Sequence, residues 1–538
     1  MRRMLASLLS INLAGALAAG CSAPPPSEEY DQPFTSDVAT LLDFDFDGQL
    51  TAASASNPKG LVRAQLLYTV GHLNGENSVA QLQKLKLTNL TTTAIGGGLY
   101  RVSYHAHLPV AWGSKVNLPS AYSLTLPLRA DAAASFEAKY GATCNDGETG
   151  SVTVDNFWYH YRPRAGGCAL APADVLTAGA TVRVSTENTV AKYPEYHKIW
   201  EDGRLQILAI FGKYAVTGKD HSDAGVSAFD EFVAAVRAEF PSATTFPANL
   251  PTDPGIDDQA DDVTFELVRS DGTEIAITAI LVSSVPTAGA AFNKRYGELA
   301  TNADLVMYNG HAGLGANVRY LSTLGHWFPG KYQILFMDGC DTFAYVDDTI
   351  PKQRALLNPD DPTGTKYMDM VTNAMPAYFV SLAGSTMALV RALSAPTTPK
   401  SWGTIFRDVD AAQVAVVTGE EDNVFTPGYD PGASWNGLNG KGVVGYKQTM
   451  SWTTELLQPG TYVFATSAEP SNSSGDADLR VRVGAPPTIT STYKCRSYVA
   501  NSNERCQLTL TAPGQVYLSV TGDSTALARF DVDGFQIQ

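Results

Sequence analysis

The sequence predicts a multidomain protein with a β-rich N-terminal domain, a central α/β domain built on a mostly parallel sheet, and a C-terminal β-sandwich. Its 538 residues are enough for about three domains. Apolar and polar residues alternate in short runs at first, apolar runs then alternate with helical periodicity, and short strand-like runs return near the end. The expected domains are residues 30–200, 201–419 and 446–538, with a Gly-, Asn-, Asp- and Pro-rich linker at 420–445.

The first domain is predicted as β structure. Residues 42–47 and 99–104 alternate apolar and polar side chains, which is typical of a strand with one buried face. Three glycines at 96–98 predict a turn before the second run. A sandwich is one arrangement that such strands could form.

The second domain is predicted as alternating strands and helices. Residues 205–211 suit a buried parallel strand. A helix then begins at Ser222 or Asp223, either of which can cap it, and stops at Pro241. The further expected elements are an acidic loop at 244–262, strands at 263–268 and 274–282, a helix at 287–301, strands at 305–308 and 332–337, a helix at 364–375 and a strand at 377–382. This order predicts helices on both faces of a mostly parallel sheet.

Charge and the N-terminus indicate an exported protein. The formal net charge is -16, so no basic surface is available for nucleic acid. Arg2 and Arg3 precede a mostly apolar stretch at 4–19 that is too short for a membrane span. Residues 17–21 (LAAGC) resemble a bacterial lipobox, although Leu17 lies one place further upstream than usual. We expect a signal peptide at 1–20, diacylated Cys21 and a tether at 21–29, which would anchor the protein to the outer membrane or cell surface; a plain secretory signal is the alternative.

Cysteine spacing singles out one thiol. Cys144 and Cys168 flank one loop and Cys495 and Cys506 flank another, so in an oxidising compartment each pair is expected to form a disulfide. That leaves Cys340 as a reactive thiol, an intermolecular partner or an inert buried cysteine.

Two segments combine a strand with a reactive side chain at its end. Residues 304–310 lead to His311, and residues 332–339 lead to Cys340. Ligands bind at the carboxyl ends of strands in an open parallel sheet, so neighbouring strands would bring imidazole and thiol to one edge. A thiol nucleophile with an imidazole acid/base is the pair that acyl transfer needs. The adjoining Gly310, Gly313 and Gly339 let the backbone approach a substrate.

This pair of segments resembles the caspase/gingipain-like (clan CD) cysteine peptidases over roughly residues 200–415. The resemblance implies that Cys340 is the nucleophile, that His311 is the base/acid, and that the backbone around Ala312, Gly313 and Gly339–Cys340 holds the oxyanion. Family members usually carry Gly directly after the His, where this chain has Ala312.

The C-terminal region resembles the bacterial pre-peptidase C-terminal domain, a β-sandwich attached to many secreted peptidases. The matching segments are 475–481 (GDADLRV), 493–496 (YKCR) and 503–506 (NERC). This module implies secretion and an adhesive or stabilising role, and it supplies no catalytic group.

The sequence therefore favours a cell-surface cysteine endopeptidase acting on peptides or proteins. The alternatives are a non-catalytic binding lipoprotein with a degenerate peptidase-like domain, and an N-terminal domain that acts as a cleaved pro-region. Calcium is conceivable at the DxDxDG segment 43–48 or the acidic loop, and His105 and His107 share a strand face. The first segment lacks the rest of a calcium loop, the acidic loop is expected to be solvated, and the histidines lack a third ligand, so no metal or cofactor is expected.

Overall fold

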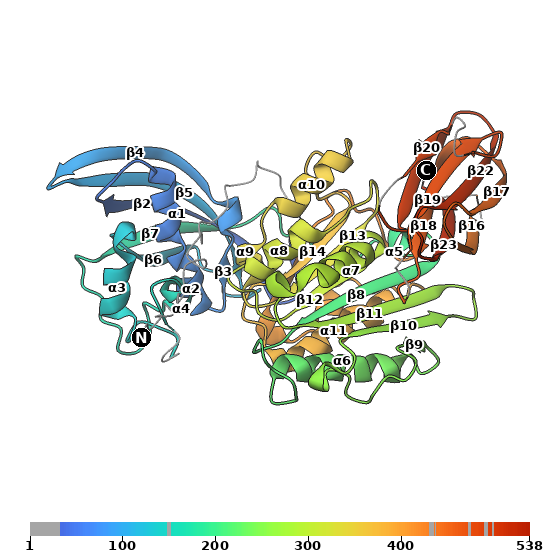
Figure 1. Cartoon of the computed structure of the whole chain (residues 1–538). Coiled ribbons are helices and arrows are strands. Elements are labelled where there is room, and N and C mark those ends of the chain that lie inside the picture. Colours follow the sequence, from blue (N-terminus) through green and yellow to red (C-terminus); the bar gives the residue numbers. More distant parts are fainter. Residues whose placement is uncertain are drawn as a thin grey trace, which may run out of the picture.

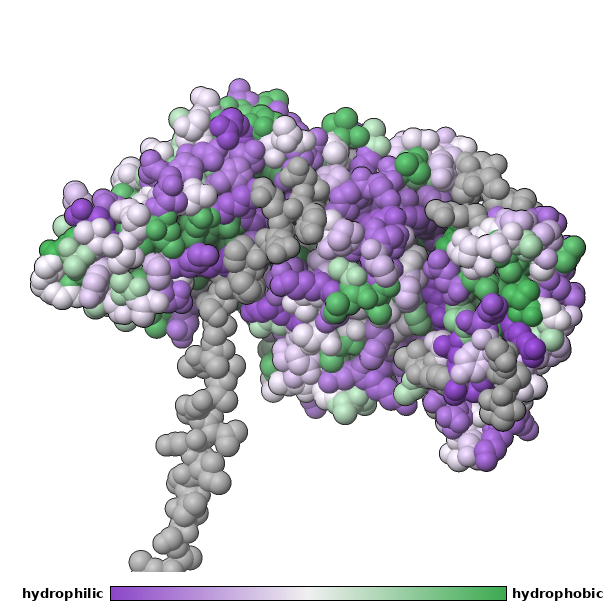
Figure 2. All heavy atoms as spheres, turned by 90° about the horizontal axis from the view of Figure 1, so that it is seen from above, coloured by the Kyte–Doolittle hydropathy of each residue, from purple (hydrophilic) through white to green (hydrophobic). Residues whose placement is uncertain are grey.

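The computed structural model describes residues 33–147, 152–429, 435, 437–471, 475–488, 493–497 and 500–537. Three units lie in a row, with the central α/β unit between two β-rich ones (Figure 1). The predicted signal peptide, Cys21 and the tether lie outside the described residues. Among those that are described, no helix is both long enough and apolar enough to span a bilayer. The face seen in Figure 2 is largely hydrophilic, with apolar residues in separate small groups.

The N-terminal unit is a six-stranded sheet backed by short helices. The strand order is β3-β5-β2-β7-β6, and β4 pairs with β5. Strand β2 has one buried face, formed by Leu42, Phe44 and Phe46, while the aspartates between them lie on the other face. The predicted alternation is thus confirmed. The elements are β2 (Thr40–Ala52), α1 (Pro58–Leu66), α2 (Tyr68–Asn74), β3 (Val79–Ala80), β4 (Lys86–Gly96), β5 (Leu99–Trp112), β6 (Ala121–Pro127), α3 (Ala133–Tyr140), α4 (Phe157–His160) and β7 (Val175–Val184).

The central unit is a nine-stranded mixed sheet in the order β1-β15-β14-β13-β12-β8-β11-β10-β9. Its middle, from β11 to β14, is parallel, and antiparallel strands close both sides. Strand β1 comes from the range predicted for the N-terminal domain and pairs with β15, so that part of the chain contributes an edge strand to the central sheet. The strands are β1 (Thr35–Ser36), β8 (Arg204–Gly212), β9 (Thr244–Phe246), β10 (Asp262–Val268), β11 (Glu274–Val282), β12 (Leu305–Asn309), β13 (Gln333–Asp338), β14 (Met368–Asn373) and β15 (Ala415–Gly419).

Helices cover both faces of this sheet, as the order of elements predicted. Residues of α6 and α11 share one apolar core with the sheet, and residues of α7 and α8 share the other (Figure 1). The Asp223 carboxylate caps α6 by accepting from the N–H groups of Gly225 and Val226, and the helix ends before Pro241. The helices are α5 (Tyr196–Ile199), α6 (Ala224–Glu239), α7 (Gly289–Asn302), α8 (Ala316–Leu324), α9 (Thr342–Tyr345), α10 (Thr349–Leu357), α11 (Phe379–Leu393) and α12 (Trp402–Phe406).

Two predicted elements are wrong. The helix expected at 364–375 is strand β14, and the strand expected at 377–382 is the start of helix α11. Every residue of β14 is buried, so its sequence shows neither a two-residue nor a helical period. Its one charged residue, Asp369, is buried as well and has its hydrogen-bond partners inside the protein.

The C-terminal unit is a sandwich of two four-stranded sheets, as predicted. The sheets have the orders β16-β23-β18-β21 and β17-β22-β19-β20 and enclose an apolar core of their own. A disulfide joins Cys495 of one sheet to Cys506 of the other. The strands are β16 (Leu438–Val444), β17 (Thr449–Leu457), β18 (Gly460–Ala468), β19 (Ala477–Val483), β20 (Cys495–Arg496), β21 (Glu504–Leu510), β22 (Gly514–Gly522) and β23 (Ala528–Gln536). Strand β16 lies wholly within the segment predicted as a linker at 420–445, so that prediction is wrong over this strand.

The outer units meet opposite ends of the parallel strands. Arg204 begins β8, and its guanidinium lies 3.1 Å from Asp531 and 3.5 Å from Asp533 of the sandwich. Asp341 follows β13 at the other end, and its carboxylate accepts from Asn74 of the N-terminal unit at 2.9 Å. The carboxyl edge of the sheet is therefore bounded by the N-terminal unit.

The central sheet contains a buried carboxylate, Asp369, whose contribution to stability can be measured. It lies 2.6 Å from Lys192 Nζ, and it accepts from Tyr332 Oη at 2.7 Å and Trp402 Nε1 at 3.1 Å. Asp369→Ala leaves Lys192 buried without its counter-charge, so we expect the free energy of unfolding to fall by about 3–5 kcal/mol. Guanidinium unfolding followed by tryptophan fluorescence measures this loss. Asp408→Ala breaks the exposed pair with Lys400 and should change stability by no more than about 1 kcal/mol; equal losses in both variants contradict the prediction.

Candidate active site

Strand pairing places His311 and Cys340 at the same edge of the central sheet. Strands β12 and β13 are parallel neighbours, and Asn309 pairs with Asp338 at their carboxyl ends. His311 and Cys340 each follow two residues after this last pair. The adjacency that the sequence could only assume is thus present.

Two glycines let the loops touch. A Cβ on Gly339 would lie 2.8 Å from the Gly310 carbonyl oxygen and 3.2 Å from the Ala312 nitrogen, so a larger residue would force the loops apart. Gly310 itself has φ of +151°, a conformation that other residues rarely adopt. The small residues beside His311 and Cys340 are therefore required by backbone approach.

His311 is exposed and held by backbone and aromatic contacts. Its Nε2 lies 3.2 Å from the carbonyl oxygen of Tyr214, which can only accept, so Nε2 carries a proton. The ring centroid lies 5.0 Å from both the Tyr214 and Phe379 rings. In the neutral tautomer this leaves Nδ1 unprotonated and able to take up a proton.

Cys340 is half-buried and protonated at neutral pH. Its thiol donates to the Ala377 carbonyl oxygen at 3.7 Å. Burial, followed by the charge of Asp341, raises the pKa of Cys340 to about 11. Since Ala377 lies two residues before Phe379, the thiol and the imidazole flank the same turn into α11, but within the described chain they do not hydrogen-bond to each other.

Backbone donors are available between the two side chains. Among the described residues, the N–H groups of Ala312, Gly313 and Cys340 donate to no protein acceptor. These are the backbone groups that the resemblance assigned to an oxyanion hole, with Gly339 providing the close approach. Ala312 is only 3% exposed and packs into the core shared with the N-terminal unit.

Three aspartates near the two motifs have structural partners. Asp304 directly precedes β12, at the end of the strand away from the site, and pairs with Lys331. Asp338 is buried beneath the site, accepts from Asn373 at 2.7 Å, and has its pKa raised by burial to about 7. Burial raises the pKa of Asp341 to about 6. Among them, only Asp341 lies beside the thiol.

The N-terminal unit forms a wall of the site that sequence reasoning missed. Asn74 binds the Asp341 carboxylate, and the Trp158 ring meets the Tyr345 ring edge-on at 6.2 Å. The Tyr159 phenol lowers the pKa of both Cys340 and Asp341 by hydrogen bonding. The aromatic run at 157–161 was the available signal, but nothing in the sequence linked it to Cys340.

The other predicted residues fall into structural roles. Cys144 and Cys168 form a disulfide, as do Cys495 and Cys506, which is typical of oxidising compartments, and Cys340 is the free thiol of the described chain. The DxDxDG segment lies in β2 rather than in a calcium loop. Nδ1 of His105 lies 2.9 Å from Asp47, and Nδ1 of His107 lies 3.0 Å from Asp45.

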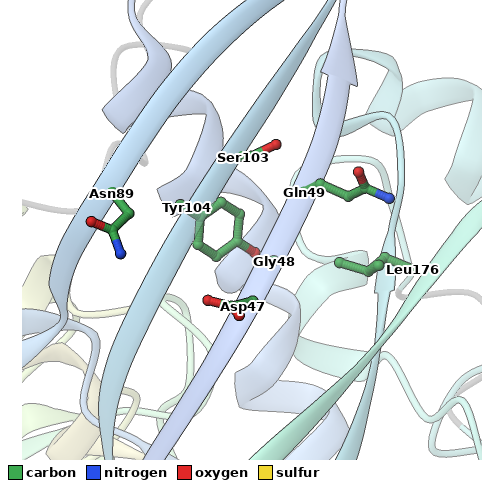
Figure 3. Close-up of a pocket in the computed structure, with 7 residues that line it drawn as sticks. All are labelled: Asp47, Gly48, Gln49, Asn89, Ser103, Tyr104 and Leu176. Carbon is green, nitrogen blue, oxygen red and sulfur yellow. The ribbon is translucent and has the colours of Figure 1, made fainter.

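A pocket of about 380 Å³ opens on the N-terminal sheet rather than at Cys340. Figure 3 shows Asp47, Gly48 and Gln49 on one strand beside Ser103 and Tyr104 on the next. Asn89 and Leu176 complete the lining. The pocket contains neither His311 nor Cys340.

Comparisons with known proteins cover parts of the chain. No protein-family model matches it. Over 80 residues it is 44% identical to a virulence metalloprotease of Vibrio anguillarum, which is 14% of this chain and 12% of that protein. The pre-peptidase C-terminal domain of a Bacillus anthracis collagenase is similar at 12% identity, covering 18% of this chain and 87% of that one with a TM-score of 0.15. The periplasmic lysozyme inhibitor PliG of Aeromonas hydrophila matches at 15% identity, 20% and 90% coverage and a TM-score of 0.16.

The sequence match shows partial homology to a virulence metalloprotease over a short segment. The chain spans only 12% of that relative's length. The structural likenesses, with their low TM-scores, carry no argument.

The pKa of Cys340 predicts how the thiol reacts. Because the thiolate is the nucleophile, alkylation by iodoacetamide in the folded protein should keep rising with pH up to about 11, whereas the unfolded chain should level off near about 8.5. Tyr159→Phe removes a hydrogen bond that lowers this pKa, so its profile should shift to still higher pH. Mass spectrometry of the Cys340 peptide measures the rates.

The control variant is Tyr320→Phe. It removes a phenol that accepts from Asn293 in a different part of the unit, so it should leave the alkylation profile of Cys340 unchanged. A wild-type rate that levels off near neutral pH would instead show a thiolate already stabilised in the resting protein.

Proposed function

We propose that this chain is an exported cysteine endopeptidase in which Cys340 attacks the peptide carbonyl and His311 transfers the proton. The observation that carries the proposal is the placement of the free thiol and an imidazole directly after two paired parallel strands. The same placement underlies the resemblance to caspase/gingipain-like peptidases. The partial homology to a metalloprotease supports a peptidase in the broader sense.

The proposed reaction uses the groups at this edge. Cys340 Sγ bonds to the carbonyl carbon as its proton passes to His311 Nδ1. The carbonyl oxygen becomes an oxyanion held by the N–H groups of Ala312, Gly313 or Cys340. His311 then gives the proton to the departing amine, which breaks the C–N bond and leaves a thioester. Water, deprotonated by His311, hydrolyses the thioester and restores the thiol.

The raised pKa of the thiol fits general-base catalysis rather than a preformed ion pair. A protonated resting thiol loses its proton only as the new bond forms, and His311 is exposed enough to meet a bound substrate. The buried Asp341 beside the thiol works against ionisation, and Tyr159 works for it. We infer that the N-terminal unit sets the reactivity of Cys340.

A metal-dependent mechanism is the first competing catalytic type, because the matched relative is a metalloprotease. The shared 80 residues are too few to span the central α/β unit at 201–419, so they do not transfer that protein's catalytic centre to this chain. The cysteine type rests on Cys340 and His311.

A non-catalytic surface lipoprotein is the second candidate function. It is favoured by Ala312, which replaces the family's Gly and is fixed in the core shared with the N-terminal unit. The thiol and imidazole also lack a direct hydrogen bond. If the protein is such a lipoprotein, the C-terminal sandwich and the N-terminal sheet would bind partners. The lipid at Cys21 would hold the protein on the membrane.

A removable N-terminal pro-region is a third arrangement. Its removal would uncover the apolar surface around Phe343, Ala344 and Tyr345, which now share a core with the N-terminal unit. It would also strip β1 from the sheet edge. These contacts favour retention of the N-terminal unit in the working protein.

Peptidyl acyloxymethyl ketone probes test the catalytic proposal on residues 22–538 under reducing conditions, with and without calcium. We expect labelling of the wild type, none in Cys340→Ala, and a rate lower by about 10²–10⁴-fold in His311→Ala. His105→Ala removes an imidazole paired with Asp47 on the outward face of the N-terminal sheet and should label normally.

Three outcomes would contradict the cysteine mechanism. Peptide cleavage that persists in Cys340→Ala and stops with 1,10-phenanthroline would establish a metal-dependent enzyme. Equal labelling of Cys340→Ala would place the reactive group elsewhere. No labelling of a folded wild type, together with none in Ala312→Gly, would leave the binding lipoprotein as the function.

A further inference from the structure

Three metal-ligating side chains from separate parts of the chain meet beside the start of α6. His221 precedes the helix, Asp230 lies within it, and Asp253 lies in the loop before β10. Nε2 of His221, a carboxylate oxygen of Asp230 and one of Asp253 all lie within 4.8 Å of one another. None of these residues belongs to the proposed dyad.

The spacing of these atoms suits a small metal ion. His221 Nε2 lies 2.9 Å from Asp230 Oδ2 and 3.9 Å from Asp253 Oδ1. In a four-coordinate zinc site with bonds of about 2.0–2.1 Å, neighbouring ligand atoms lie about 3.4 Å apart. These two distances lie on either side of this value, and the carboxylate oxygens of Asp230 and Asp253 lie within 4.8 Å of each other.

The central ligand is already oriented by its neighbours. Asp230 is 3% exposed, and its second oxygen accepts from the Gly255 N–H at 2.7 Å. A Cβ on Gly255 would lie 3.0 Å from that oxygen, so only glycine fits here without displacing the carboxylate. A carboxylate held through its other oxygen is the outer support that metal ligands commonly have.

The local charge also favours a cation. Two carboxylates, of Asp230 and Asp253, approach one imidazole here, and a divalent cation would balance their charge. The preceding loop carries two lysines: Lys213 is paired with Asp258 at 2.6 Å, and Lys219 is exposed two residues before His221, with its backbone carbonyl accepting from the Asp257 N–H at 2.7 Å. The other acidic residues of the segment are Asp257, Asp261 and Asp262. His221 when neutral brings no positive charge to the two carboxylates.

We propose that His221, Asp230 and Asp253 bind a divalent transition-metal cation of the Zn²⁺ class. An imidazole with two carboxylates suits Zn²⁺, Co²⁺ or Mn²⁺, whereas Ca²⁺ takes oxygen ligands. His221 and Asp253 are about half exposed, at 48% and 45%, so the ion can enter and leave and water can fill its remaining positions.

Metal binding would tie together the segments that support His311. The loop at 213–223 carries His221 at one end and Tyr214 at the other, and Asp223 accepts from the Tyr214 N–H at 2.9 Å. Tyr214 in turn supplies the carbonyl that accepts from His311. An ion shared with Asp253 would restrain this loop; any effect on catalysis rests on the proposed function.

Calorimetric titration with Zn²⁺ tests the site on residues 22–538 carrying Cys340→Ala, because that background removes the free thiol as a competing ligand. We expect a binding event that is lost in His221→Ala and weakened about tenfold or more in Asp253→Asn. His160→Ala, which removes another imidazole of a His–Asp pair, should leave it intact. Co²⁺ should give a visible absorption that disappears with the same variants.

Amide hydrogen exchange measures whether the metal restrains the loop at 213–223. Zn²⁺ should slow exchange in peptides covering 213–223 and leave peptides of the C-terminal sandwich unchanged. Titrations that are identical in the parent and His221→Ala, or no binding to a folded parent, overturn the proposal. Neither measurement uses catalysis, so a failure here is distinct from a failure of the peptidase proposal.

Discussion

The contact between the N-terminal unit and the loop after β13 governs the proposed site. Asp341 adopts a left-handed conformation at φ of +51°, and its buried carboxylate is held by Asn74. Around it, Phe34 packs edge-on against Phe343 at 5.9 Å, and the two units share one apolar core. A strained backbone residue persists only where its surroundings determine it. The position and the acidity of the Cys340 thiol therefore depend on a part of the chain that precedes the α/β unit.

The N-terminal unit is a structural part of the α/β unit. A β-rich segment ahead of a peptidase-like domain suggests a separable module, but here it contributes a strand to the central sheet and a wall beside the thiol. Its outward face is polar, and the aspartate–histidine pairs between β2 and β5 lie on that face. One face of the N-terminal sheet thus packs on the core shared with the α/β unit, and the opposite face is turned outward.

Much of the central architecture could be predicted because its signals are local. The Asp223 cap and the spacing of Phe229, Phe232 and Val236 define α6 without reference to the rest of the chain. Strand β14 and helix α11 were exchanged because full burial removes the polar contrast on which periodicity depends. Helix α8, which buries Val318 and Leu321 between the two motifs, was missed.

For the site, the sequence indicated the edge and the two reactive side chains, since both follow directly from strand ends. Their supporting contacts could not be predicted, because they join distant residues: Asn74 and Asp341 are 267 positions apart. The cluster of His221, Asp230 and Asp253 was hidden for the same reason, as a helix turn and a loop have to meet before its three ligand atoms converge.

The docking of the C-terminal sandwich has a consequence for when this protein can fold. Burial works against the charge of Arg204, yet Asp533 and Asp531 keep its pKa above the ordinary value. The first residue of β8 thus pairs with carboxylates more than 300 positions later, in addition to Glu274 of the neighbouring strand at 3.2 Å. At the other side of the same sheet, Thr35 pairs with Val417. The central sheet therefore cannot form completely before Val417 has been made, and Arg204 gains two of its carboxylate partners only when the sandwich follows. A chain with such distant requirements stays incompletely folded while it emerges, which suits a protein that has to cross a membrane before it acquires its final structure.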